Sequence, residues 1–243
     1  MSIYPQILGV YSQAKEAELG TGSTQGQYDQ VTYWYVRRLN DSDYEVQPLN
    51  AYHVPSGICT TLAQNDFATQ YSPEPTYYEV HTQPALKSLE AKIAKGEEEF
   101  AKGNLDEAER SFLKALMIDD LNVPANLGVG AVYTEKKEFD KLKKTLKILL
   151  NQDATFAIEQ RQRFNTLGMS LRKQGLHEEA LAYYLKALEN SQEDENLHFN
   201  VARVYFEKGD QINTIEHLGK CLAINPDLEV AQKFMRYCEK NFK

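Results

Sequence analysis

The sequence predicts a mainly α-helical protein, in which an α-solenoid of tandem helical pairs follows a small, mainly β (α+β) domain. Small residues recur in apolar helical stretches at Gly96, Gly130, Gly168 and Ala202, with spacings of 34, 38 and 34 residues. Internal repeats of this length are typical of solenoids. Composition also changes near residue 84, because ten of the 15 tyrosines, the only tryptophan and six of the eight prolines precede residue 85. The remainder is rich in helix-forming Ala, Leu, Lys and Glu.

Residues 1–71 are predicted to form the small β-rich domain. Its clearest strand is residues 30–39, which are aromatic and β-branched. The Asn-Asp-Ser-Asp sequence at 40–43 favours a turn into a returning strand at 44–49. Weaker strands are expected at 7–12 and 53–60, and a short helix at 66–71. This domain resembles no family that we identify.

A proline-containing connector is expected at residues 72–84. Pro73 and Pro75 restrict the residues before them to extended conformations. We therefore expect a stiff linker here rather than a helix.

The aromatic strand at 30–39 raises the question of what its side chains contact. Alternation places Tyr33 and Tyr35 on one face and Trp34 and Val36 on the other, so at least one face is expected to be core. The alternatives for Trp34 are a partner-binding surface and a platform for stacking bases. The net charge of the first 84 residues, -6, opposes the nucleic-acid alternative.

Further positions recur within residues 85–243. Ala108 is followed by Phe112, and Ala180 by Tyr184, at the same distance from the preceding small residue. The segments Gly-Asn-Leu-Asp-Glu-Ala-Glu-Arg-Ser-Phe-Leu-Lys-Ala-Leu (103–116) and Gly-Leu-His-Glu-Glu-Ala-Leu-Ala-Tyr-Tyr-Leu-Lys-Ala-Leu (175–188) contain the full pattern. This pattern resembles the tetratricopeptide repeat (TPR), a helix–turn–helix of about 34 residues. Small residues let the two helices approach, the aromatic ring fills the gap, and the glycine permits the turn.

The resemblance implies four repeats and a C-terminal capping helix. In the second repeat, Leu142 and Leu149 replace small residues and Lys137 replaces the turn glycine, so we expect a distorted helix crossing. Four extra residues precede the third repeat, and we expect them to lengthen its first helix into one running from Phe156 to Lys173. The implied repeats are 89–122, 123–156, 161–194 and 195–228, and the capping helix is 229–242.

The resemblance also implies that the first helices of the repeats line a concave groove that binds a peptide segment. Met169, Phe199 and Phe206 are its expected apolar anchors. Arg172 and Arg203, one repeat apart, are expected to be unpaired on one wall, where they favour a carboxylate-bearing ligand. That ligand is either an acidic peptide of another protein or the acidic N-terminal domain of this chain. The implied groove residues are Ile93, Phe100, Leu127, Asn165, Met169, Arg172, Lys173, Asn196, Phe199, Arg203 and Phe206; for the aromatic ones, packing between repeats is the alternative.

Several chemistries find no support in the sequence. The net charge of -8 disfavours nucleic acid, and no apolar run is long enough to predict membrane insertion. The five histidines have no metal-ligand spacing, no nucleophile–base set is visible, and the glycine-rich stretch at 20–26 lacks the lysine of a phosphate-binding loop. We therefore expect no metal, no cofactor and no enzymatic activity. Three widely spaced cysteines without a signal peptide predict reduced thiols and a cytoplasmic location.

The sequence thus predicts a non-enzymatic scaffold or adaptor for protein–protein interaction. Two alternatives remain. In one, residues 1–84 form a ligand-binding or catalytic domain that the repeats recruit. In the other, the open ends of the solenoid make the protein a structural unit that assembles into homo-oligomers.

Overall fold

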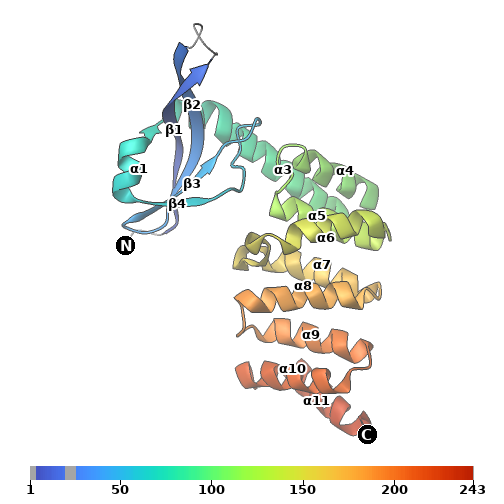
Figure 1. Ribbon diagram of the computed structural model, residues 1–243. Helices are drawn as coiled ribbons and strands as arrows, with labels where there is room; N and C mark the ends of the chain where they lie inside the picture. Colours follow the sequence, from blue (N-terminus) through green and yellow to red (C-terminus); the bar gives the residue numbers. More distant parts are fainter. Residues whose placement is uncertain (1–3, 20–25, 243) are drawn as a thin grey trace. The chain divides into compact units, whose positions relative to one another are not determined.

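The computed structural model describes residues 4–19 and 26–242 (Figure 1). Its contacts divide the chain into two compact units. The first comprises Met1–Glu98 with Arg110–Asn122, and the second comprises Glu99–Glu109 with Val123–Lys243. The first helical pair is therefore divided between the two units, which do not coincide with the boundaries expected at residues 71 and 84.

The first unit contains an antiparallel sheet, in which the described residues form five strands in the order β4-β3-β2-β1-β5. β1 and β2 pair along their whole length and extend well beyond the strands predicted at 7–12 and 30–39. Their register shifts between Ile7 and Gly9, where Gly9 has a φ of +99° that suits glycine. The glycine-rich stretch lies outside the described residues up to position 25. The strands are β1 (Gln6–Leu19), β2 (Gly26–Arg38), β3 (Asp43–Pro48), β4 (Thr60–Ala63) and β5 (Ser72–Pro73).

The predicted turn after β2 and the predicted short helix are both present. Asn40 Oδ1 accepts hydrogen bonds from the backbone N–H groups of Ser42 and Asp43, at 2.8 and 2.9 Å, and thereby holds the turn. Helix α1 spans Gln64–Gln70 and buries Phe67. Local sequence signals were sufficient for both elements.

The predicted strand at 53–60 is wrong. Asn50 Oδ1 accepts a hydrogen bond from the N–H of Tyr52, and His53 adopts a left-handed φ of +63°, so the chain turns here instead of extending. The strand at this edge of the sheet begins only at Thr60. The hydrogen bond from the backbone to the Asn50 side chain therefore had more influence on the local conformation than the β-branched residues of 53–60.

Apolar side chains from β2 and β3 pack under α1. Val36, Val46 and Tyr44 are buried with Phe67, and the Tyr44 and Phe67 rings stack with centroids 4.4 Å apart. Trp34 is half-buried against this cluster. It therefore belongs to the packing of the sheet, as the alternation predicted for at least one face.

The opposite face of β2 is covered as well. Tyr33 stacks on Tyr77 with ring centroids 3.9 Å apart, and Tyr35 is buried near Tyr78. Burial raises the pKa of Tyr35 to about 12. Both faces of the aromatic strand thus contribute to the interior of the first unit.

The predicted connector is extended only at its start. After β5 the backbone becomes helical almost at once and remains so to residue 101. The prediction of an extended linker is therefore wrong for most of its length. The helical elements are α2 (Pro75–Tyr77), the π-helical segment η2 (Tyr78–Thr82) and α3 (Gln83–Ala101).

The two prolines in this helical stretch occupy tolerated positions. Pro75 lies at the first helical residue, where an absent N–H loses no hydrogen bond. Pro84 follows the π-helical segment, in which the N–H of Gln83 bonds to the carbonyl of Tyr78. The wider π turn relieves the clash that a proline ring makes with the carbonyl one α-turn earlier.

The remaining helices follow one another as hairpins (Figure 1). α5 packs on α6, α7 on α8 and α9 on α10, while α11 packs on α10 without a following partner in the described chain. Each hairpin contributes a first and a second helix to the solenoid that the sequence predicted. The helices are α4 (Leu105–Leu116), α5 (Val123–Glu135), α6 (Phe139–Leu150), α7 (Arg161–Lys173), α8 (His177–Asn190), α9 (Glu195–Glu207), α10 (Gln211–Ile224) and α11 (Glu229–Asn241).

The periodic small residues lie where the helices of a pair approach most closely. A Cβ atom added to Gly96 would lie 2.7 Å from the Phe112 ring, and one added to Gly168 would lie 2.5 Å from Cζ of Tyr184. Such distances are shorter than carbon atoms tolerate. Glycine is therefore required at these two positions because a large ring occupies the space of its side chain.

The second pair keeps the usual turn without a glycine. Gly103, Gly175 and Gly209 have φ values of +80°, +76° and +79°, and Lys137 has a φ of +58° at the same place. Lys137 thus accepts a backbone conformation that costs about 1–2 kcal/mol for a residue with a Cβ. The missing glycine did not remove the turn.

The extra residues before the third pair do not lengthen its first helix. They form two 3₁₀ turns, η3 (Asp153–Phe156) and η4 (Ile158–Gln160), which are separated by an extended Ala157. The ring of Phe156 packs against Phe164 with centroids 5.7 Å apart. A large apolar side chain that needed burial therefore folded the insertion back onto the array.

Candidate functional site

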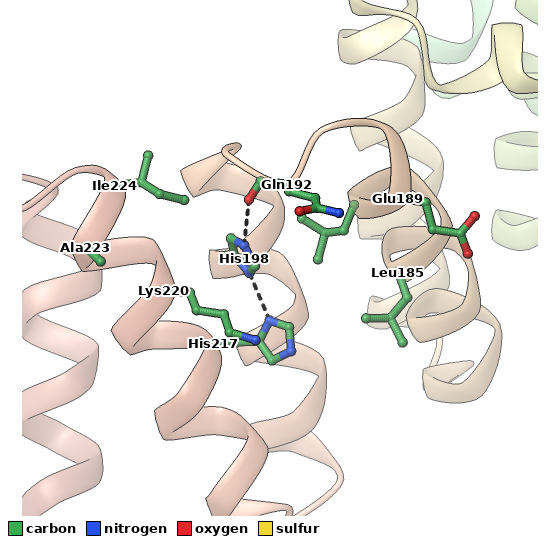
Figure 2. Close-up of a pocket in the computed structure, with 9 residues that line it drawn as sticks. Leu185, Glu189, Gln192, His198, His217, Lys220, Ala223 and Ile224 are labelled. Atoms are coloured by element: carbon green, nitrogen blue, oxygen red, sulfur yellow. Dashed lines mark hydrogen bonds between the residues drawn. The ribbon is translucent and has the colours of Figure 1, made fainter.

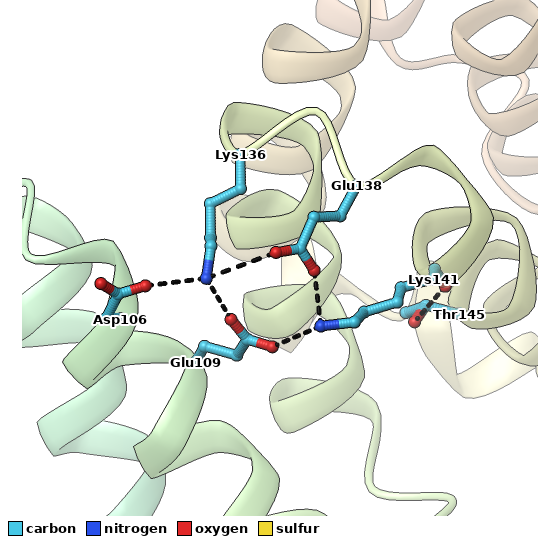
Figure 3. A network of polar contacts seen from close by, with 6 residues as sticks. All are labelled: Asp106, Glu109, Lys136, Glu138, Lys141 and Thr145. Atoms are coloured by element: carbon cyan, nitrogen blue, oxygen red, sulfur yellow. Dashed lines mark hydrogen bonds and ion pairs between the residues drawn. The ribbon is translucent and has the colours of Figure 1, made fainter.

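A network of charged side chains connects α4 with the turn between α5 and α6 and with α6 itself (Figure 3). Lys136 Nζ lies 2.8 Å from Asp106 and 2.5 Å from Glu109, and Lys141 Nζ lies 3.0 Å from Glu109 and 2.6 Å from Glu138. The hydrogen bonds with Asp106 and Glu109 raise the pKa of Lys136 above its usual range. Because every charge in this set has an opposite partner, the network holds helices together and offers no free group to a ligand.

A pocket of about 360 Å³ lies between α9 and α11, and its position coincides with part of the predicted groove. Phe199, Arg203 and Phe206 of α9 form one wall. Phe234 of α11 forms the opposite wall, and Glu207 lies at the end of α9. We call this the α9/α11 pocket.

The rings of the α9/α11 pocket stand edge to face. Phe234 lies 6.2 Å from Phe199 and 5.1 Å from Phe206, measured between ring centroids, at interplanar angles of 80° and 76°. All three side chains are half-buried on a core cluster that contains Ala202 and Cys221. One side of each ring therefore packs on the interior while the other lines the pocket, so packing and groove were not exclusive alternatives.

The charges at the α9/α11 pocket differ from the prediction. Arg172 is not unpaired, because it forms an ion pair with Glu207, which also lies 3.4 Å from Nε2 of His177. Arg203 has no hydrogen bond or ion pair within residues 4–19 and 26–242; its guanidinium lies 5.8 Å from the centre of the Phe199 ring. Burial and the neighbouring Arg172 lower the pKa of Arg203. The pocket thus presents one incompletely compensated cation.

The other predicted groove residues do not gather at one place. Ile93 and Leu127 are buried, so they serve packing rather than an accessible surface. Asn165 accepts a long hydrogen bond of 3.5 Å from Asn200 on the next first helix. Met169 is 38% exposed and available to a ligand, but it does not line the α9/α11 pocket. The remaining ones are Phe100, which is half-buried, and Lys173 and Asn196, which are exposed.

Two residues of the pocket escaped the sequence reasoning. Phe234 was expected only as part of the capping helix, and Glu207 was not considered. The signal for Glu207 was present, since an acidic residue 35 positions after Arg172 is one repeat away on the neighbouring first helix. A search for opposite charges one repeat apart would have found this pair.

Among residues 4–19 and 26–242, no three His, Cys, Asp or Glu side chains converge as metal ligands. Cys59 is exposed and Cys221 and Cys238 are buried, all three as free thiols. No described helix combines the length and the apolar composition that crossing a membrane requires.

The stacked hairpins define an α-solenoid. Residues 162–191, which cover most of α7 and α8, match the family model of the tetratricopeptide repeat. α7 and α8 therefore form a tetratricopeptide repeat, as the sequence pattern indicated, and the other hairpins continue the same helix–turn–helix architecture. Arrays of this kind are generally scaffolds for protein interaction.

The solved structures that match this chain share little sequence with it. The MamA protein is 21% identical over 63% of this chain and 82% of its own, with a TM-score of 0.49. The pilF protein of Pseudomonas aeruginosa is 21% identical over 63% of this chain and 68% of its own, with a TM-score of 0.50. The Cut9–Hcn1 hetero-tetramer of the APC/C gives 20% identity over 65% of this chain and 31% of the other, with a TM-score of 0.46. The likeness to pilF concerns the fold alone. No curated protein sequence matches the chain.

Proposed function

We propose that this protein is a non-enzymatic scaffold that binds a peptide segment of a protein partner in the α9/α11 pocket. The observation that carries the proposal is an accessible pocket that combines three aromatic rings with an unpaired guanidinium, between the first helix α9 and the capping helix α11. Binding energy in such sites comes mainly from a few aromatic and arginine side chains. The free thiols support a cytoplasmic, reducing setting.

The ligand chemistry follows from the walls of the pocket. Phe199, Phe206 and Phe234 favour an apolar side chain of the peptide, which loses contact with water on binding. Arg203 favours a carboxylate next to that side chain, because its charge is partly desolvated and lies near Arg172. Glu207 is already engaged by Arg172 and does not compensate Arg203 fully. The proposed ligand is therefore an acidic segment with one large apolar anchor.

A selection from a random peptide library with the full chain tests the proposal. Enriched peptides are expected to carry Asp or Glu beside an aromatic or large aliphatic residue. Arg203→Glu should weaken the selected peptides at least tenfold, because it replaces attraction of the carboxylate by repulsion. Arg236→Glu is the matched control, since Arg236 is an exposed arginine on α11 outside the pocket and undergoes the same change of charge.

Two results would contradict the proposal. The first is an Arg203→Glu protein that keeps full affinity while retaining its helical content. The second is enrichment of basic peptides, which the positive pocket should repel. If binding depends on salt but both arginine variants behave alike, general surface charge and not the α9/α11 pocket is responsible.

A further inference from the structure

A separate pocket of about 590 Å³ lies on the second helices of the array (Figure 2). Leu185 and Leu188 of α8 form one wall and Ile224 of α10 forms another. The imidazoles of His198, on α9, and His217, on α10, lie between these walls. This α8/α10 pocket shares no lining residue with the α9/α11 pocket. Its volume falls in the range of about 300–1,000 Å³ that is usual for ligand sites.

The hydrogen bonds of the two imidazoles determine which nitrogens carry protons. The backbone carbonyl of Gln192 lies 3.0 Å from Nε2 of His198 and can only accept, so His198 Nε2 is the donor. Nδ1 of His198 is then the acceptor of the 3.0 Å bond from Nδ1 of His217. Neither imidazole forms an ion pair within the described chain, and a buried cation without a carboxylate is costly. Burial and the neighbouring His198 and Lys220 lower the pKa of His217 to about 4, which agrees with a neutral ring.

This proton arrangement leaves one acceptor at the pocket wall without a donor from the protein. His217 donates through Nδ1, so its Nε2 carries a lone pair, and that atom has no hydrogen-bond partner in the described residues. The side chain is only 8% exposed, and in Figure 2 this nitrogen lies on the side of the ring that faces Leu185. A ligand with a suitable donor pairs with this acceptor, whereas an apolar group that excludes water from it leaves it unpaired at a cost of about 1–3 kcal/mol.

The charged groups at the rim do not call for an ionic ligand. Lys220 Nζ lies 2.6 Å from Glu216, and Glu189 lies 2.5 Å from Lys186. Each charge is thus compensated within its own helix. The complement of this pocket is a neutral group with an apolar body and one hydrogen-bond donor at its tip.

We propose that the α8/α10 pocket binds a tyrosine side chain of a protein partner, whose ring packs between Leu185 and Ile224 and whose hydroxyl donates to Nε2 of His217. A phenol joins an apolar ring to a hydroxyl donor in one rigid group. A cavity of about 150 Å³ already holds benzene, so this pocket has room for the ring and for neighbouring residues of a bound segment. A protein segment is therefore a better match to its size than a free phenol.

Titration of the full chain with N-acetyl-tyrosinamide and N-acetyl-phenylalaninamide tests this proposal by NMR. The tyrosine compound should shift the methyl signals of Leu185, Leu188 and Ile224 and the Nε2 signal of His217. The phenylalanine compound should bind at least tenfold more weakly, because its ring displaces water from Nε2 of His217 and offers no donor in return. Equal affinities of the two compounds, or shifts confined to other residues, would overturn the proposal.

Two variants test the same contacts without relying on the ligands alone. Leu185→Lys places a charged chain on an exposed wall position and should weaken the tyrosine compound at least tenfold, whereas Ile212→Lys, which alters an 81% exposed residue of α10 outside the pocket, should change nothing. His217→Phe keeps a ring but removes the acceptor, so the two compounds should then bind equally. A preference for tyrosine that survives in His217→Phe would disprove the role of His217. Circular dichroism of each variant checks that the helices are retained.

Discussion

The third and fourth helical pairs fill one position with different chemistry. In the third pair Phe164 stacks on Tyr183, with ring centroids 4.4 Å apart and planes 17° from parallel. One 34-residue repeat later, His198 and His217 take the equivalent positions and share a hydrogen bond of 3.0 Å. Both pairs thus place two flat rings in contact at this position. The aromatic rings are held by packing, whereas the two imidazoles are held by a hydrogen bond that one shared proton makes. Only the second is sensitive to pH.

A second pair of positions shows compensation of volume. Gly168 faces the large ring of Tyr184, whereas the equivalent residues in the fourth pair are Ala202 and Leu218. Ala202 and Leu218 are both fully buried in one cluster. A larger residue on the first helix therefore accompanies a smaller one on the second, which keeps the interior filled. In these two pairs the summed volume of the two side chains is similar although their identities differ.

The largest expected difference between the third and fourth pairs is their response to acid. Low pH is expected to destabilise the fourth pair and not the third. The pKa of His217 is about 4 in the folded protein against an ordinary value of 6.5, so the unfolded chain binds the proton more readily. The stabilisation is complete above pH 6.5 and is lost as the pH falls from 6.5 to 4, by up to about 3 kcal/mol. Amide exchange of α9 and α10 should accelerate over this range relative to α7 and α8.

The matched control transplants the aromatic version into the fourth pair. The double variant His198→Phe/His217→Tyr should lose this additional acid sensitivity, because nothing in the position then titrates between pH 4 and 6.5. Carboxylates elsewhere titrate equally in both proteins and cancel in the comparison. Equal acceleration of α9 and α10 in the double variant and the natural protein would contradict the explanation.

Gly168→Ala is expected to lower the free energy of unfolding by up to about 2 kcal/mol. The new Cβ would lie 2.5 Å from Cζ of Tyr184, and such overpacking usually costs about 1–3 kcal/mol, against a gain of about 1 kcal/mol in helix propensity. Gly130→Ala is the control, because its Cβ would lie 3.3 Å from Leu167 and should be tolerated. Urea unfolding curves measure both, and similar losses in the two variants would show that the large ring is not the cause.

Lys137→Gly should stabilise the second pair by about 1 kcal/mol. Glycine adopts the φ of +58° without strain, although it loses more chain entropy on folding than lysine does. Gly209→Ala gives the reverse test, since its φ is +79° and no atom lies within 4 Å of the added Cβ, so backbone strain alone should destabilise it. Thermal melting of the two variants should shift in opposite directions; shifts of the same sign would show that the turn is unstrained at Lys137.

The smallest expected effect concerns local opening. Residues 137–157 contain the strained turn and the first 3₁₀ segment, so their amides should exchange somewhat earlier than those of residues 175–190. Mass spectrometry of exchanged peptides resolves the two regions. Equal protection would mean that Leu142 and Leu149, which are buried, anchor α6 as firmly as the aromatic residues anchor α8.

Much of the helical part was predictable because its packing constraints recur along the chain. Each small residue and its partner on the second helix meet at a fixed separation, which makes the pattern visible without coordinates. The left-handed turn at Lys137 was not predictable, since it depends on neighbouring hairpins that impose a conformation against local preference. The π-helical passage before Pro84 was missed for a related reason: a proline excludes an ideal helix but not a locally widened one.

The candidate site was predictable only in part. The spacing of the repeats placed Phe199, Arg203 and Phe206 together, and they line one pocket. It could not show that Arg172 is neutralised by Glu207, because the pairing depends on the conformations of two long side chains. Nor could spacing distinguish Ile93, a buried residue, from an accessible groove residue at the corresponding place.

Because the chain is helical from Pro75 to Ala101, the number of residues in this segment determines how the contacts at its two ends are oriented relative to each other. Tyr78 packs near Tyr35 of the sheet, and Gly96 further along the same helical run meets Phe112. Each residue of an α-helix turns the chain by about 100° and advances it by about 1.5 Å. Inserting one residue between Tyr78 and Gly96 would rotate one contact out of phase with the other, whereas a flexible linker would absorb the same insertion. The number of residues between Tyr78 and Gly96 is therefore constrained by the fold, in addition to their composition.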